Sequence, residues 1–247
     1  MNDRFIQSVL IDWDKISPDS YLREIPALQF EEPLSFDSSV AFFVGENGTG
    51  KSTLLEAIAV ACGFNPEGGT KNYNFSTYDS HSELHRAMKI SRGFRRPRGS
   101  YFLRAESFYN VASKAEDYRD GEPESIFYSR YGGKSLHRQS HGESFLALIQ
   151  GNFEPGGFYI LDEPEAALSP QRQLTLLIYI HRLAEQGAQF LIASHSPILL
   201  GLPGAQLLSF DGGAIHACEY TQTQSYQVTE MFINNREYFL ERLLRET

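Results

Sequence analysis

Cysteine is scarce in this chain of 247 residues, which contains only Cys62 and Cys218. Two isolated cysteines match neither a metal-binding spacing nor a disulfide framework, so reduced thiols are the simplest interpretation. Apolar runs of membrane-spanning length are also missing, and the first residues lack the apolar stretch of a signal peptide. We therefore expect a cytoplasmic protein with no direct membrane insertion.

Positive charge is in short supply as well, because 22 lysines and arginines face 31 aspartates and glutamates, for a net charge of −9. This balance argues against broad affinity for nucleic acid. One segment runs against it and contains no carboxylate. Its basic residues are Arg86, Lys89, Arg92, Arg95, Arg96, Arg98 and Arg104. A solvated basic face and a patch that meets the phosphates of a nucleotide, DNA or RNA are both open interpretations.

The composition suits a globular protein, with 41% hydrophobic and 21% charged residues. A chain of this length has room for one large α/β domain or two small ones. No internal repeat appears. Apolar runs of strand length alternate with stretches of helical spacing, and this alternation predicts a mostly parallel sheet.

The expected elements are concentrated in the first and final thirds of the chain. We expect strands over 39–44, 99–105, 157–162 and 189–194, helices over 53–60, 82–90, 144–150, 171–186 and 228–244, and a hairpin around 211–213. The longest internal helix is amphipathic, and we place Leu174, Leu177, Ile178 and Leu183 on its apolar side. The last helix is interrupted near residues 234–235.

The most informative feature is a glycine-rich loop that fits the pattern G-x-x-x-x-G-K-[ST] at every fixed position. It reads Gly45, Glu46, Asn47, Gly48, Thr49, Gly50, Lys51 and Ser52, and Thr53 continues into the helix that follows. Glycines let N–H groups turn inward on phosphates, and the helix N-terminus favours anions. Lys51 would reach the β- and γ-phosphates, and Ser52 would offer its hydroxyl to Mg²⁺.

Further polar groups follow two buried strands. Asp162 and Glu163 end the strand over 157–162, and His195 comes directly after the strand over 189–194. Because the carboxyl ends of parallel strands share one edge of a sheet, we expect these side chains beside the phosphate loop. Asp162 is then suited to hold Mg²⁺, Glu163 to orient the attacking water, and His195 to reach the γ-phosphate.

These elements, in this order, resemble the motifs of ABC-type ATPases. Residues 45–52 match the Walker A loop, 158–164 match the Walker B strand with its catalytic glutamate, and His195 matches the switch histidine. Residues 139–144 resemble the ABC signature, usually Leu-Ser-Gly-Gly-Gln, and keep its serine and its fourth-position glycine. The departures are Gln139, His141 and Glu143 within the signature, and Ser169 where the D-loop usually has aspartate.

The resemblance implies that the protein binds ATP with Mg²⁺ and hydrolyses it. In this family the signature binds the γ-phosphate held by a second subunit, which implies a head-to-tail homodimer with two sandwiched nucleotides. Ser140, Gly142 and Glu143 would then contact nucleotide across the interface. The family's Q-loop glutamine has no counterpart, and Glu106 is our candidate for its substitute at the metal. A simple surface carboxylate is the alternative for Glu106.

The whole chain is similar to the small, stand-alone ATPases of the AAA/ABC-like group. This group is related to the SMC-like repair ATPases, but the present chain has no sustained heptads between Walker A and the signature. The implied fold is an α/β P-loop NTPase head of ABC type, with a mainly parallel central sheet, an antiparallel N-terminal sheet and a helical signature subdomain. We expect one domain over 1–247, with its core in about 1–75 and 151–247 and the subdomain in about 76–150.

The expected function is an ATP-hydrolysing molecular switch coupled to an unidentified protein partner. One alternative is a nucleic-acid-associated ATPase of repair or phage defence, which the basic segment favours and the net charge opposes. Another is the ATP-binding subunit of a membrane transporter. The altered signature, the missing Q-loop glutamine and Ser169 argue against the transporter.

Overall fold

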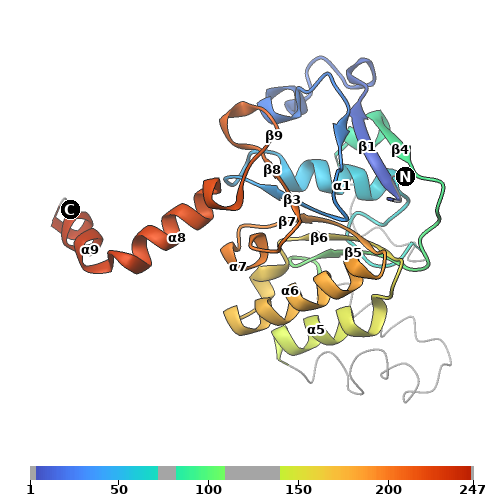
Figure 1. Cartoon of the computed structure of the whole chain (residues 1–247). Helices are drawn as coiled ribbons and strands as arrows, with labels where there is room; N and C mark the ends of the chain where they lie inside the picture. Colours follow the sequence, from blue (N-terminus) through green and yellow to red (C-terminus); the bar gives the residue numbers. More distant parts are fainter. Residues whose placement is uncertain (1–3, 72–81, 109–139, 246–247) are drawn as a thin grey trace.

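The computed structural model describes residues 4–71, 82–108 and 140–245 (Figure 1). Its centre is a six-stranded sheet in the order β5-β6-β7-β3-β8-β9. The bounds are β3 Val40–Val44, β5 Ser100–Arg104, β6 Phe158–Asp162, β7 Gln189–Ala193, β8 Gln206–Ser209 and β9 His216–Ala217. All neighbouring pairs are parallel except β8 and β9, which form the expected hairpin around residues 211–213.

A second, antiparallel sheet is built from β1 Ile6–Ile11, β2 Leu34–Ser35 and β4 Met88–Arg92. The mainly parallel central sheet and the antiparallel N-terminal sheet that the sequence implied are therefore both present. The helix expected over 82–90 is mostly wrong, because α2 covers only Leu84–Ala87 and the chain then enters β4. Pairing of β4 with the distant strand β1 decides its conformation, and a local pattern cannot register that pairing.

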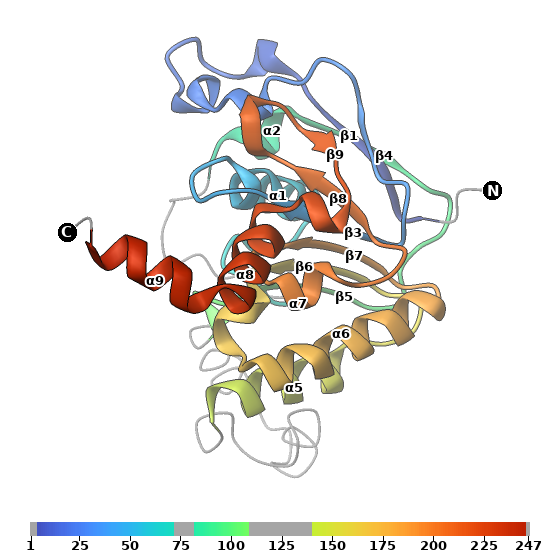
Figure 2. The ribbon, with the colours of Figure 1, turned by 60° about the vertical axis from the view of Figure 1, so that its left-hand side comes forward.

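Helices cover the two faces of the central sheet (Figure 2). Helix α1, Lys51–Ala61, lies between the two sheets, whereas α5 His141–Asn152 and α6 Pro170–Glu185 cover the opposite face. The strands are apolar on both sides as a result. Val40, Phe42 and Val44 of β3 point into the core under α5 and α6, and the residues between them point into the core around α1.

Strands β4 and β5 fall inside residues 76–150, where a helical subdomain was expected. The structure places β4 in the antiparallel sheet and β5 at the edge of the central sheet. Both strands have partners far away in the sequence, namely β1 and β6. Within that stretch, the described helical part is α2 and α5, the helix that the signature opens.

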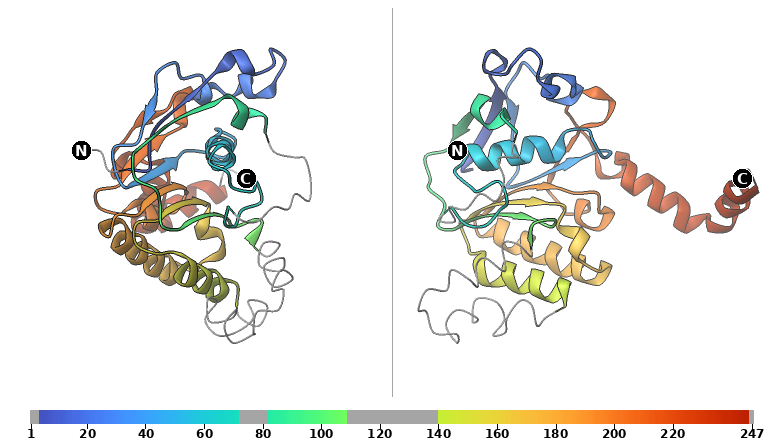
Figure 3. Two further views of the ribbon diagram at one scale, coloured as in Figure 1. Left: turned by 90° about the vertical axis from the view of Figure 1, so that its right-hand side faces the viewer. Right: turned by 180° about the vertical axis from the view of Figure 1, so that it is seen from behind.

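Short elements complete the body of the molecule. They are the single-turn helices η1 Trp13–Lys15, η2 Tyr21–Glu24, η3 Pro26–Leu28, η5 Pro164–Ala167, η6 Asp211–Gly213, η7 Tyr220–Gln222 and α7 Pro197–Leu200. The chain then leaves the body as α8 Gln224–Asn234 and α9 Arg236–Arg245, which project outward (Figures 1 and 3). The expected interruption near residues 234–235 is confirmed. Among the described helices, none combines the length and apolar character needed to cross a membrane.

Helix α6 is amphipathic as expected, but its buried face differs from the predicted one. Leu174 and Ile178 are 46% and 50% exposed, whereas Leu176, Ile180 and Leu183 are buried. The buried residues follow the spacing i, i+4, i+7 of one helix face. Of the four residues predicted on the apolar side, Leu183 is buried and Leu177 packs partly buried against the core, whereas Leu174 and Ile178 were placed wrongly.

The same substitution at two leucines of α6, one buried and one exposed, therefore tests which side of the helix packs against the core. We expect Leu176→Ala to lower the free energy of unfolding by about 2–5 kcal/mol, because it opens a cavity in the core. Leu174→Ala should change that free energy by less than about 0.5 kcal/mol. Urea unfolding of the two variants measures both values, and equal losses would contradict the burial described here.

Candidate functional site

The phosphate loop connects β3 to α1, and its backbone requires glycine. Gly45, Gly48 and Gly50 have φ values of 138°, 81° and 98°. A Cβ at Gly50 would also lie 2.8 Å from the Ile25 side chain. No side chain caps the first turn of α1. The N–H groups of that turn are therefore left to a ligand, and the positive end of the helix favours an anion.

Lys51 is buried against this loop. Its Nζ donates hydrogen bonds to the carbonyl oxygens of Gly45 at 2.8 Å and Glu46 at 2.6 Å. Burial lowers the pKa of Lys51, and the carboxylates of Glu163, Asp211 and Asp162 oppose that shift. The ammonium is thus held inside a ring of acidic groups, where phosphate oxygens could replace the two carbonyls as acceptors.

Ser52 and Asp162 meet at the start of α1 and the end of β6. The Ser52 hydroxyl donates to Asp162 Oδ1 at 2.8 Å. A hydroxyl beside a carboxylate offers the hard oxygen ligands that Mg²⁺ prefers. The described residues contain no group of three or more acidic, histidine or cysteine side chains able to hold a metal. Ser52 and Asp162 therefore fit a Mg²⁺ site in which the remaining ligands come from phosphate and water.

Arg104 joins this pair, and the sequence analysis did not place it in the site. It ends β5 directly opposite Asp162 in the parallel register. Its Nε lies 3.4 Å from Asp162 Oδ2, and its Nη1 lies 2.6 Å from Glu56 Oε2. Burial raises the pKa of Asp162, while the Arg104 guanidinium and the Ser52 hydrogen bond act to lower it. Arg104 thus supplies a cation to a buried carboxylate that would otherwise be costly.

Glu163 and His195 lie next to each other at the same edge. Glu163 is the one residue other than glycine with positive φ in the described chain, at 50°. Its Oε1 is 3.7 Å from His195 Nε2. Burial and the nearby Lys51 lower the pKa of His195. Its Nε2 is buried and has no hydrogen-bond partner among the described residues, so it is available to a ligand.

Two more carboxylates stand at this edge and were missed as site residues. The Glu165 carboxylate accepts a hydrogen bond from the backbone N–H of His195, and burial raises the Glu165 pKa. Asp211 Oδ1 accepts from the backbone N–H of Glu46 at 2.9 Å. Asp211 follows a buried strand in the way that Asp162 does, and this signal was read only as a hairpin turn. Both residues shape the site by holding backbone in place.

The remaining residues of the loop line open space. A hollow of about 980 Å³ is lined by Pro26, Asn47, Asp211 and His216, among others. A second hollow of about 550 Å³ reaches from the loop to His195 and to the start of α8. Thr49 donates its hydroxyl to the Glu46 carbonyl within the loop, and Thr53 is half-buried in the first turn of α1.

The signature residues open α5, which contacts η5, the turn that follows Glu163. Ser140 and Glu143 form a capping box at the start of α5. Arg172 of α6 donates to the Ser140 hydroxyl at 3.2 Å and to Glu143 Oε1 at 3.1 Å. Gly142 packs so tightly that a Cβ there would lie 2.5 Å from the Arg172 side chain. Figure 1 shows α5 and the phosphate-loop helix α1 on opposite faces of the sheet.

Glu106 is exposed in the turn after β5. Its charge acts to raise the pKa of Asp162, which places it within electrostatic range of the pair formed by Ser52 and Asp162. No metal contact follows from this position alone. Gln139 lies outside the described residues.

The basic segment does not form one patch. Arg104 points into the site, Lys89 pairs with Asp12 at 3.0 Å, and the Arg95 guanidinium lies over the Phe5 ring. Arg92 donates to the Ala61 carbonyl at the end of α1. The seven residues are divided between α2, the strands β4 and β5, which belong to different sheets, and the connection between those strands.

Solved structures define the class to which this fold belongs. The chain resembles cbiO1 from Clostridium perfringens, part of the ABC transporter complex cbiONQ, with a TM-score of 0.50 and 15% identity over 95% of this chain and 97% of that one. An SMC head domain from Thermotoga maritima gives a TM-score of 0.47 and 16% identity over 87% and 99%. The fold is an α/β P-loop NTPase head of ABC type, as the motifs implied.

Sequence comparisons agree with this class. A family model described as an AAA domain matches residues 22–180, so the chain belongs to that AAA-domain family. The hemin import ATP-binding protein HmuV of Pseudomonas aeruginosa is 29% identical over 195 residues, which cover 70% of this chain and 72% of that protein.

The buried ion pairs of Arg104 can be tested by stability. We expect Arg104→Gln to lower the free energy of unfolding by about 3 kcal/mol, because Asp162 and Glu56 lose their cation in a mostly buried setting. Arg96→Gln is the matched control, since Arg96 is exposed in the same basic segment. Chemical denaturation without nucleotide measures both, and an Arg104 variant as stable as the control would contradict this role.

Proposed function

We propose that this protein binds Mg-ATP and hydrolyses it at the edge of the central sheet. One observation carries the proposal: Lys51, Ser52, Asp162, Glu163 and His195 come from three separate segments and gather around one phosphate loop. Each offers a group that phosphoryl transfer to water requires. The family and its ABC-type relatives support the same conclusion.

The roles of the side chains follow from their positions. Lys51 and the N–H groups of α1 would bind the β- and γ-phosphates, and Ser52 with Asp162 would hold Mg²⁺, which offsets charge on the phosphate oxygens. The half-exposed Glu163 carboxylate would accept a proton from the attacking water. His195, whose Nε2 has no hydrogen-bond partner among the described residues, would bind the γ-phosphate. The hollow of about 980 Å³ beside the loop has room for the nucleoside.

We further propose that the site is completed by a second copy of the chain. The Ser140 hydroxyl and the start of α5 are suited to a phosphate, because helix N-termini favour anions. Within one chain, however, α5 and the phosphate-loop helix α1 lie on opposite faces of the central sheet. A head-to-tail pair would bring the signature of each copy to the nucleotide of the other. Binding of ATP would then close the dimer, and hydrolysis would open it.

The target of such a switch is a protein partner in our proposal. The relative HmuV is described as an import ATP-binding protein, which favours a transporter subunit as the second candidate. The two differ in a simple observation, because a transporter subunit would copurify with a membrane protein. Association with DNA or RNA has weaker support, because the arginines of the basic segment are dispersed.

Glu163→Gln tests the proposed chemistry. We expect this variant to bind ATP with ordinary affinity, to accumulate as an ATP-bound dimer, and to hydrolyse ATP on the order of 10²-fold more slowly, because it lacks the proton acceptor. Steady-state phosphate release and light scattering with and without ATP measure these effects.

Glu185→Gln serves as the control, since Glu185 is an exposed carboxylate at the far end of α6. Its turnover should equal that of the unchanged protein. Hydrolysis by the Glu163 variant at the unchanged rate would mean that another group activates the water.

A further inference from the structure

Helix α8 is the first part of a C-terminal arm that extends from the body into solvent and continues into α9 (Figures 1 and 3). None of its residues is buried. Val228, Met231, Phe232 and Ile233 are 53%, 44%, 40% and 70% exposed. The first three lie at the spacing i, i+3, i+4 and share one helix face. A row of exposed apolar side chains on a projecting helix indicates a surface that another molecule covers.

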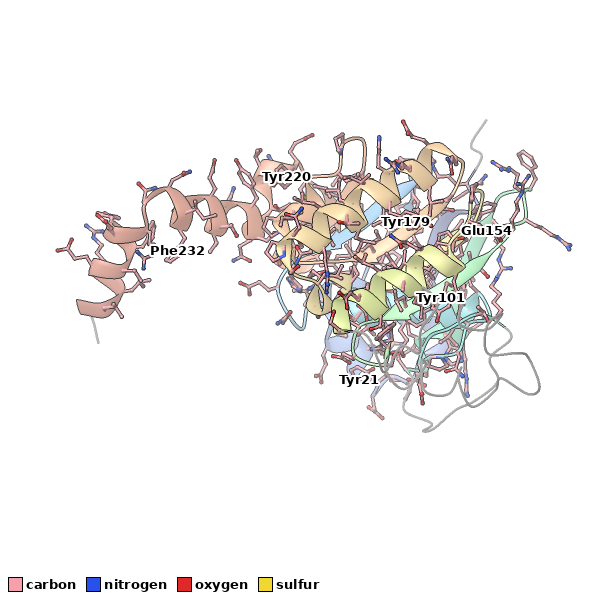
Figure 4. The ribbon with its side chains drawn as sticks, turned by 90° about the horizontal axis from the view of Figure 1, so that it is seen from below. Tyr21, Tyr101, Glu154, Tyr179, Tyr220 and Phe232 are labelled. Carbon is pink, nitrogen blue, oxygen red and sulfur yellow. The ribbon has the colours of Figure 1, made fainter. Side chains whose placement is uncertain are left out.

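The base of this arm is anchored at the nucleotide site. The Gln224 amide donates to the Glu46 carboxylate of the phosphate loop at 3.0 Å. Val228 lines the same hollow as His195 and Asp211. Behind the base, the Tyr220 ring packs on Tyr226 with centroids 4.7 Å apart (Figure 4 labels Tyr220 and, further along the arm, Phe232). The arm therefore leaves the body at the face where a second copy is proposed to bind.

A second exposed apolar surface occurs on α6. Outside the C-terminal arm, Leu174 and Ile178 are the only exposed large hydrophobic residues of the described chain that share a helix. They are four residues apart and thus on one face. Arg172, which holds the signature serine through its hydrogen bond to Ser140, is on the same helix. Ile178 lies six residues beyond it, about 9 Å along the axis.

These placements connect the arm to α6 of a second copy. In the head-to-tail pair, the signature of the partner subunit approaches the phosphate loop of this chain. Because α6 starts beside that signature, the partner's α6 would approach the loop together with it, and the partner's Leu174 and the partner's Ile178 lie on the side of that helix opposite the partner's Arg172. The arm starts at that loop, at Gln224. Two apolar faces that are uncovered in the single chain are thereby brought to the same place.

We propose that the apolar face of α8 docks on α6 of a second copy of this chain, over the partner's Leu174 and the partner's Ile178. The contact occurs twice, once for each arm, as twofold symmetry requires. It rests on the proposed ATP-dependent dimer and adds to it a clasp outside the nucleotide. The arm then links nucleotide binding at the phosphate loop to the strength of the contact between the two subunits.

Cysteine cross-linking tests the contact directly. The double variant Phe232→Cys with Ile178→Cys is made in Glu163→Gln protein that also carries Cys218→Ser, leaving the buried Cys62. We expect an intermolecular disulfide that forms with Mg-ATP and fails to form without it. Phe94→Cys replaces Ile178→Cys in the control, because Phe94 is 75% exposed and lies on neither helix. The control pair should not cross-link.

Dimer strength gives the second measurement. Met231→Ser with Phe232→Ser, in Glu163→Gln protein, should weaken the ATP-bound dimer about tenfold in sedimentation equilibrium, and Ile178→Ser should do the same from the other side. Both variants should keep the affinity of the single chain for nucleotide.

The outcomes separate this inference from the function on which it rests. If Glu163→Gln protein binds ATP but stays monomeric, the proposed dimer fails and the arm contact with it. If the dimer forms while the arm variants leave its strength unchanged and residues 232 and 178 do not cross-link, only the arm contact fails. Cross-links between two arms, or capture of a different protein by the arm, would overturn it as well.

Discussion

A single hydrogen bond from the Ser52 hydroxyl to the Asp162 carboxylate joins the first turn of α1 to the end of β6. It matters because it fixes the phosphate loop against the strand that carries Glu163 one residue further on. Arg104 holds the other oxygen of the same carboxylate and extends the connection through Glu56 back to α1. A closed network of one hydrogen bond and two ion pairs thus sets the distance between the phosphate loop and the groups that would act on its ligand.

The sequence predicted the parts of this arrangement that are local. The glycine loop, its lysine and its serine occupy eight consecutive positions. The positions with positive φ are occupied by glycine, so the loop conformation can be predicted from the residues themselves. Asp162, Glu163 and His195 were also predictable, because buried parallel strands end at one edge. Asp211 follows a buried strand as well, but it was interpreted as part of a hairpin turn. Arg104 was not predictable, since its importance depends on which strands become neighbours. The order β5-β6-β7-β3-β8 does not follow the order of the chain.

The same distinction explains the errors in secondary structure. Residues 88–92 became a strand because β1 was available to pair with it, although nothing nearby in the sequence indicates that pairing. On α6 the amphipathic pattern was right, but two of the four residues predicted on the apolar side are exposed. Leu174 and Ile178 have the apolar side chains typical of core residues, but they are exposed. Their exposure distinguishes this side of α6, proposed to contact another molecule, from the side that packs against the sheet.

The left-handed backbone at Glu163 has a consequence for how such a site can drift during evolution. Most side chains avoid that conformation, so the neighbouring contacts, including the buried Pro164 at the start of η5, must hold it. The direction of the Glu163 carboxylate therefore depends on the backbone conformation at that residue. A homologue could keep every residue of the motifs and still lose activity if the backbone at Glu163 adopts a more common conformation. Inspection of the motifs alone would not detect this loss.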